Sequence, residues 1–307
     1  MTLQQLPYTG PADQAAMAAL VRAFPADNLH VTDLPYRFSS WAFDDPRNAA
    51  RWVDAAGQLA AWAVLQTPFW ALDYAYRPDA DPAVHHQILA WASDRARAAL
   101  DTPSGRPSWF ANVFTGQAQR RRDLEQAGFA CVADIGEDSW SKVLLRRAEP
   151  APAAPALPAG FSLRPLAGAD EVSAYVDLHR AVFESTNMTV DWRARTLRHP
   201  AYHPELDLVA VAPDGRLAAF CVGWFQAGPL PSGQIEPMGV HSDFRQLGLG
   251  RAILSEAVRR LVNLGVAHID VETDSYRNAA FELYEAVGFR VIQDVLVYRQ
   301  DYAAAPA

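Results

Sequence analysis

The sequence is poor in cysteine and has no long hydrophobic run. Cys131 and Cys221 are the only cysteines among 307 residues, and their wide separation implies no disulfide framework. No apolar stretch approaches the length of a membrane span, and the polar first residues do not have the pattern of a signal peptide. We therefore expect a cytoplasmic protein with no membrane partner.

Positive charge is also scarce, and arginine supplies nearly all of it. Lys142 is the only lysine, and 27 basic residues face 35 acidic ones, which gives a net charge of −8. Both halves of the chain are net acidic, whereas nucleic-acid binding draws on clustered Lys and Arg. The composition predicts no nucleic-acid partner and favours a cationic small molecule such as an amine.

An alanine- and proline-rich stretch divides the chain near its middle. Residues 149–160, EPAPAAPALPAG, have neither a helical nor a strand period and predict a semi-rigid linker. The length of the chain suggests two domains, each large enough to bury a core. We place these domains at 1–148 and 161–307.

The two halves repeat each other at corresponding places. Residues 57–64, a turn leading into a buried strand, parallel residues 215–222. Residues 123–129, a helix end with a glycine followed by a strand, parallel residues 283–289. This similarity indicates an internal duplication.

The segment from Ile235 to Gly265 carries the clearest functional signal. It predicts a strand, a turn that contains Gly248 and Gly250, and an amphipathic helix over residues 250–264. Glycines let the backbone approach a ligand closely, and the amides of a helix N-terminus form a cradle for an anion. With two arginines in the same turn, the segment predicts a pyrophosphate site.

This turn resembles the acetyl-CoA loop of the GNAT superfamily of N-acetyltransferases, whose motif is Arg or Gln, two residues, Gly, one residue, then Gly or Ala. Arg245, Gly248 and Gly250 match it, and the order of predicted elements in the second half is similar to the GNAT fold. No Gly-Lys-Ser/Thr follows, so the turn is not a nucleotide P-loop.

The resemblance implies an α/β protein of two tandem GNAT-fold domains, each a mixed, mostly antiparallel sheet flanked by helices, as in mycothiol synthase-like proteins. It implies acetyl-CoA as co-substrate and no metal. The residues expected to bind acetyl-CoA are Met238, Gly239, Val240, Arg245, Gln246, Leu247, Gly248, Leu249, Gly250, Arg251, Asn278 and Phe281.

Pro237 lies inside the strand that precedes the turn. Because proline cannot donate to a strand ladder, it belongs at a bulge or at an ordinary sheet edge. In the resembling family this strand splays from its neighbour, and the pantetheine arm bonds to the freed backbone. Here that backbone would be Met238 to Val240, with the amide of Val240 as donor to the oxyanion.

Two side chains are candidates for the chemistry of amine acylation, which needs a base for the amine and an acid for the thiolate. Glu236 is placed where resembling enzymes often have a carboxylate base, on the same strand face as Met238. Tyr284 lies where many of them have a tyrosine acid. A solvated carboxylate and a packing tyrosine are the alternatives. Asn278 most simply caps or orders the start of its helix.

The first half lacks these features. The segment that matches the phosphate loop, residues 77–83, contains two prolines and two aspartates, which remove donors and repel a pyrophosphate. Leu124 stands in the place of Tyr284. We expect a degenerate copy that binds no cofactor and walls the acceptor cleft, and most of its tryptophans are predicted to be core.

The histidines give no catalytic or metal pattern. His199 and His203 fall in a proline-interrupted loop without the spacing of a zinc site. His85 and His86 are adjacent on a predicted helix and are interpreted as a surface pair. Cys221 lies in a buried strand and is interpreted as core.

Together these features predict an enzyme, a monomer or homodimer, that moves an acetyl group from acetyl-CoA to a small-molecule amine by direct transfer. A non-catalytic acyl-CoA sensor or partner-recognition module would keep the glycines without needing Glu236 or Tyr284. An acyltransferase acting on a peptide N-terminus is a further alternative.

Overall fold

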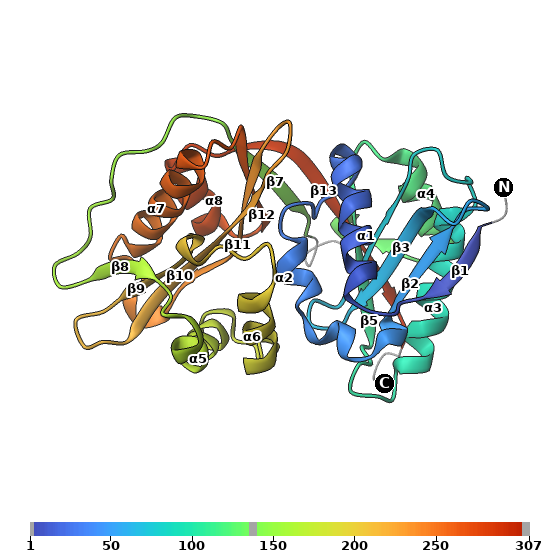
Figure 1. Cartoon of the computed structure of the whole chain (residues 1–307), viewed down its shortest axis with the longest axis horizontal. Helices are drawn as coiled ribbons and strands as arrows, with labels where there is room; N and C mark the ends of the chain where they lie inside the picture. The colour runs from blue at the N-terminus through green and yellow to red at the C-terminus, as the bar shows by residue number, and fades with distance from the viewer. Residues whose placement is uncertain (1–2, 135–139, 303–307) are drawn as a thin grey trace. The chain divides into compact units, whose positions relative to one another are not determined.

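A computed structural model describes residues 3–134 and 140–302 of the chain (Figure 1). The chain forms two compact units: Met1–Lys142 with Gln293–Ala307, and Val143–Ile292. Both are α/β, with helices against a mixed sheet, as the sequence predicted. Within the described ranges, no helix has both the length and the apolar character needed to cross a bilayer.

The sheet of unit 1 has the order β1-β2-β3-β4-β5-β13, and β6 also pairs with β13. Its strands are β1 (Gln4–Pro7), β2 (Ala49–Val53), β3 (Leu59–Gln66), β4 (Ala71–Tyr76), β5 (Ser108–Phe114), β6 (Ala130–Cys131) and β13 (Arg290–Asp301). Its α-helices are α1 (Pro11–Ala23), α2 (Leu34–Phe38), α3 (Val84–Ala99) and α4 (Ala118–Gln126).

Unit 1 has a core on each face of this sheet. Met17 of α1 and Leu34 of α2 pack with Trp62 on one face. Ile88 of α3 and Leu124 of α4 pack on the other face with a cluster that includes buried tryptophans. Trp52, Trp62 and Trp109 are almost fully buried, as predicted, whereas Trp70 is 37% exposed.

The sheet of unit 2 has the order β7-β12-β11-β10-β9-β8. Its strands are β7 (Lys142–Arg147), β8 (Ser162–Pro165), β9 (Asp207–Val211), β10 (Leu217–Gln226), β11 (Ser232–Val240) and β12 (His268–Asp274). Its α-helices are α5 (Val172–Phe183), α6 (Val190–Arg198), α7 (Leu249–Asn263) and α8 (Asn278–Ala286).

The helices of unit 2 also cover both faces of the sheet. On one face, the ring of Tyr175 in α5 packs 5.1 Å from that of Phe220 in β10. On the other, Ile253 of α7 belongs to the apolar cluster that includes Cys221, which is fully buried as predicted. The stripe of apolar residues predicted for α7 therefore faces the sheet.

The duplication is visible in the lengths of corresponding elements. β5 and β12 each have seven residues, and α4 and α8 each have nine. Both helices are followed by a glycine with positive φ, Gly128 at 92° and Gly288 at 94°. Only glycine adopts this backbone without strain, which explains why the sequence repeats there.

The compact units do not coincide with the two halves of the sequence. β7 is the last strand of the first half, yet from Val143 it belongs to unit 2. β13 is the last strand of the second half, yet from Gln293 it belongs to unit 1, where it pairs with β5 in antiparallel register. Each half therefore supplies a strand to the other unit, and the contact-based boundaries differ from 148 and 161.

The predicted linker, residues 149–160, contains no helix or strand. Its first part is fixed to unit 2 by Arg147, whose side chain is almost fully buried. That side chain donates to the carbonyls of Glu149 and Pro150, at 2.6 and 2.5 Å, and to the carbonyl of Val287 beyond α8, at 2.8 Å.

Candidate functional site

β11 and β12 separate part of the way along their length. The parallel register joins only Ser232 to His268, Gly233 to Ile269 and Gln234 to Asp270. Beyond Gln234, β11 runs on to Val240 and β12 to Asp274 without pairing with each other. The splay expected from Pro237 is therefore present, and backbone groups of both strands are left for another partner.

A bulge lies where the splay begins. Cys221 of β10 faces Met238, but Gly223 faces Ile235, so β11 has one extra residue between these pairs. Glu236 and Pro237 occupy this interval, and the indole of Trp224 donates to the carbonyl of Glu236 at 2.6 Å. A bulge redirects side chains.

The bulge changes one expectation from the sequence. Strict alternation would put Glu236 on the same face as Met238 and Val240, which pack against the apolar cluster on the α7 side. The extra residue interrupts that alternation. The negative charge of Glu236 acts on tyrosines of two different helices, Tyr175 of α5 and Tyr284 of α8.

The turn after β11 leads directly into α7. Gln246 and Gly248 have positive φ angles of 63° and 83°, and Gly248 is the N-cap residue. No side chain caps this helix, so its first amides have no partner within the helix or from a cap. Positive charge from the helix dipole and from Arg245 and Arg251 surrounds them.

Gly250 brings the start of α7 close to the splayed strands. A Cβ atom at Gly250 would lie 3.4 Å from both Leu283 of α8 and Val240 of β11. A methyl group would make ordinary van der Waals contacts there, and a larger side chain would reach further toward the same neighbours. The helix start, the end of β11 and α8 thus meet around Gly250.

Tyr284 lies in the same region and is 6% exposed. Burial, and then the charge of Glu236, raise the pKa of Tyr284 above its usual value. The phenol is therefore protonated at neutral pH and can act as a hydrogen-bond or proton donor. Its ring packs 5.8 Å from that of Phe289, so packing and chemistry coexist at this residue.

The remaining predicted residues lie at the surface of this region or in its packing. Gln246 and Gly248 are exposed, Leu247 is 47% exposed, and Phe281 packs against the apolar cluster. Asn278 lies at the start of α8 as its first residue, and the N-cap position belongs to Arg277.

A buried polar cluster beside Glu236 was missed from the sequence. Arg193 of α6 pairs with Asp207 of β9, and both are 1% exposed or less. The guanidinium lies 3.6 Å over the ring of Tyr175, and the hydroxyl of Tyr202 donates to Asp207 at 2.7 Å. Sequence spacing gave no signal, because these residues come from three separate elements and a connecting loop.

The histidines have structural contacts. His199 accepts a hydrogen bond from the amide of Ala201 at 3.1 Å, and His203 packs edge-on against Phe225. Across the described residues, no three His, Cys, Asp or Glu side chains gather as a metal site would require.

Unit 1 has other residues at the positions that correspond to Gly250 and Leu283 of unit 2. His85 is the second residue of α3, as Gly250 is of α7, and Asp123 of α4 corresponds to Leu283. His85 Nδ1 lies 2.8 Å from an oxygen of Asp123. The interpretation of His85 as a surface residue is therefore wrong: its side chain is 1% exposed, and only that of His86 is half exposed.

The chain before α3 is acidic, unlike the turn before α7. The carboxylate of Asp81 accepts a hydrogen bond at 2.9 Å from the amide of Ala83, which is the N-cap residue of α3. β4 and β5 pair only at Ala71 and Phe110, so they splay as β11 and β12 do. In that gap, Asp73 forms a two-pronged ion pair with Arg37.

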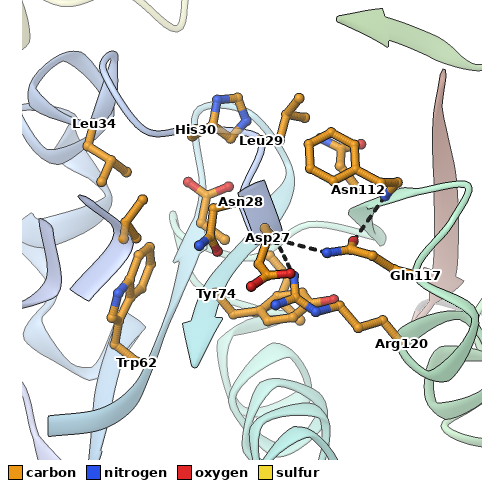
Figure 2. A pocket seen from close by; sticks show the side chains of 14 residues that line it. Asp27, Asn28, Leu29, His30, Leu34, Trp62, Tyr74, Asn112, Gln117 and Arg120 are labelled. Carbon is orange, nitrogen blue, oxygen red and sulfur yellow. Dashed lines mark hydrogen bonds between the residues drawn. The ribbon is translucent and has the colours of Figure 1, made fainter. Parts of the chain in front are cut away.

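A small cavity lies in the gap of unit 1 (Figure 2). Its volume is about 40 Å³, and its lining includes Asp73, Tyr74 and Asn112. Figure 2 shows Gln117 and Arg120 both donating to Asp27, which closes one side. Such a volume accommodates a few water molecules. The absence of a cofactor site in this unit stays a prediction, and these contacts support it.

Residues 173–289 match the model of the Acetyltransferase (GNAT) family. These residues form a GNAT acetyltransferase domain. They include β11, the turn with Gly248 and Gly250, α7 and α8, so the elements that surround the splay are the elements of the family match.

Curated relatives share one name. A mycothiol acetyltransferase of Kineococcus radiotolerans is 35% identical over 159 residues, which cover 50% of this chain and 49% of that protein. The chain thus spans about half the length of this relative. A mycothiol acetyltransferase of Pseudarthrobacter chlorophenolicus is 28% identical over 76% of this chain and 80% of its own length.

A solved structure supports the tandem architecture. The tandem GNAT protein from the clavulanic acid biosynthesis pathway aligns with 99% of this chain and 100% of its own, with a TM-score of 0.65 and 16% identity. At this identity the likeness concerns the fold alone. It confirms the GNAT fold, in the tandem arrangement that the repeat predicted.

Proposed function

We propose that unit 2 transfers an acetyl group from acetyl-CoA to the amine of a small molecule. The observation that carries this proposal is the splay of β11 from β12, which begins at the bulge holding Glu236 and faces the uncapped start of α7. Tyr284 lies on the helix that meets both. The family match supports an acetyltransferase, and the assignment of residues is ours.

The residues of this region fit the parts of a coenzyme A thioester. Amides from Gly248 to Arg251, with the guanidinium of Arg245 at the entrance of the turn, would hold the pyrophosphate. Backbone groups of Met238 to Val240 would hold the amide-rich arm. Bound there, acetyl-CoA supplies an activated acyl group. Gly250 keeps the approach open, because a larger side chain would fill the space beside Val240.

The side chains provide the proton transfers of acylation. Glu236 would accept the proton of the attacking amine, and Tyr284, protonated at neutral pH, would donate one to the leaving thiolate. The amide of Val240 would stabilise the oxyanion. Cys221 is fully buried, and burial raises the pKa of its thiol, so transfer would proceed without a cysteine nucleophile.

The relatives suggest which acceptor to test first. Because they are named mycothiol acetyltransferases, the amine acceptor of those enzymes is the first candidate for this chain. The net charge of −8 is compatible with a cationic amine. Unit 1 would bind no cofactor.

A thiol-release assay with acetyl-CoA and a panel of amines tests the proposal. Purified protein should release coenzyme A only when an acceptor amine is present. Glu236→Gln should lower kcat at neutral pH by about 10²–10⁴-fold, the usual contribution of a general base. It should also remove the acidic limb of the pH–rate profile.

Glu282→Gln is the matched control, because Glu282 is exposed on α8 and should tolerate the change. Equal rates and pH profiles for wild type and Glu236→Gln would rule out Glu236 as the base. Binding of acetyl-CoA without turnover on any amine would favour the acyl-CoA-binding alternative.

A further inference from the structure

A cavity that involves α7 lies beside the linker, in unit 2. It has a volume of about 820 Å³, within the range of small-molecule sites. Three segments enclose it: the chain from Arg147 to Ala156, the first turns of α7, and the end of α8 with the residues that follow it. We call this cavity the linker pocket.

The linker pocket opens at the phosphate-binding end of α7. It is lined by Gly248, Arg251, Ala252 and Ser255, which are spaced so that they share one face of the helix. Gly250 instead faces α8 and the splayed strand. A ligand held by the amides at the helix start could therefore extend in two directions, along the splay and into the linker pocket.

The linker forms a fixed wall of this pocket. The three hydrogen bonds of Arg147 tie Glu149 and Pro150 to Val287. The linker and the residues after α8 approach each other closely, because a Cβ atom at Gly288 would lie 2.6 Å from a carboxylate oxygen of Glu149. A buried guanidinium that bonds three carbonyls holds its partners in one arrangement. The segment expected to be a spacer is thus part of a cavity.

The wall is apolar, and the pocket mouth is basic. Residues 150–156 contribute only alanine and proline, which offer apolar surface and few donors. Arg251 is exposed and has no ion pair or side-chain hydrogen bond within the described ranges. Over the whole lining, three arginines face two glutamates, Glu149 and Glu285, so one positive charge is in excess.

We propose that the linker pocket takes the 3′-phosphoadenosine end of coenzyme A. The linker is the wall against the adenine base, and Arg251 contacts the 3′-phosphate. The proposal rests on the proposed function and extends it, because it makes the interdomain linker part of the co-substrate site. Arg147 is then a positioning residue that holds the wall.

Calorimetry on the full-length protein tests this directly, with coenzyme A and 3′-dephospho-coenzyme A as the two probes. Arg251→Gln should raise the Kd for coenzyme A by about tenfold, because a charge-assisted phosphate contact is lost. The same variant should change the Kd for the dephospho form much less, by about twofold.

A matched pair of linker variants tests the wall. Ala153 lines the pocket, whereas Ala159 is an exposed linker residue outside it. Ala153→Asp should raise the Kd for coenzyme A by about tenfold, because a carboxylate there would repel phosphate and lie against the base. Ala159→Asp carries the same charge change and should bind like wild type.

The outcomes separate this proposal from the proposed function. No binding of coenzyme A to the wild-type protein would defeat both. Tight binding by wild type, with equal Kd values for Ala153→Asp and Ala159→Asp, would overturn the linker wall and leave acetyl transfer standing. An equal loss of affinity for both probes in Arg251→Gln would overturn the assignment of the 3′-phosphate.

Discussion

Replacing Arg193 by methionine should destabilise unit 2 strongly. Arg193 and its partner Asp207 are 1% exposed or less, so the substitution leaves a carboxylate without its counter-charge away from water. Removing one member of a buried ion pair costs about 3–5 kcal/mol. Tyr202 still donates to Asp207 and offsets part of this.

A loss of about 4 kcal/mol converts to a fall in Tm of about 10 °C for a unit of this size. The pair also connects α6 to β9, while the guanidinium packs on Tyr175 of α5. We therefore expect α5 and α6 to loosen first. Acetyl transfer should decline at temperatures at which coenzyme A still binds.

Thermal unfolding and urea titration of the full-length protein measure the effect. The double variant Arg193→Met with Asp207→Asn removes the orphaned charge and should recover about 1–3 kcal/mol. The control is Arg216→Ala, which breaks a solvent-exposed ion pair with Asp214 and should unfold like wild type.

Two results would refute this reasoning. One is an Arg193→Met variant that unfolds within about 1 kcal/mol of wild type, because the carboxylate would then have another way to be compensated. The other is a double variant no more stable than the single one. In that case packing on Tyr175, and not the charge of Asp207, would set the cost.

Further expectations concern pH, chain division and packing. Burial lowers the pKa of His179 from 6.5 to about 3, so the unfolded chain binds the proton first and stability falls as pH drops below 6.5. Denaturant titrations at pH 7 and pH 5 should show about 2 kcal/mol lost through this histidine, and His179→Phe should flatten that dependence; an unchanged slope would contradict the burial. A fragment of residues 143–292 should give a cooperative unfolding transition. A fragment of residues 161–307 lacks β7 and carries β13 unpaired, so it should aggregate. The reverse result would contradict the exchange of strands between the two halves. Gly239→Val should destabilise unit 2 because even a Cβ atom would lie 2.3 Å from Val182, and wild-type stability in that variant would show that α5 can move away.

Local patterns predicted most of the elements of the second half. The helix expected at 250–264 spans Leu249–Asn263, and the strand expected before the turn spans Ser232–Val240. These elements were accessible because their apolar period and their glycines are properties of neighbouring residues. The bulge was one of the two places expected for Pro237, the other being an ordinary sheet edge.

Contacts between distant segments could not be predicted in this way. Nothing in the sequence of β7 or β13 indicates that each joins the unit of the other half, because pairing partners leave no local pattern. The pair of Arg193 with Asp207 also leaves no local pattern in the sequence. His85 was misplaced because the sequence showed two adjacent histidines and not the carboxylate of Asp123, which comes from another helix.

Isothermal titration of coenzyme A into wild type and Gly250→Val tests the central claim most directly, namely that the start of α7 beside the splay holds a coenzyme A thioester. Wild type should bind with one site per chain, and Gly250→Val should lose at least about tenfold in affinity, because its side chain fills the space between Leu283 and Val240. Equal affinity of the two proteins, or no heat from wild type, would contradict the account.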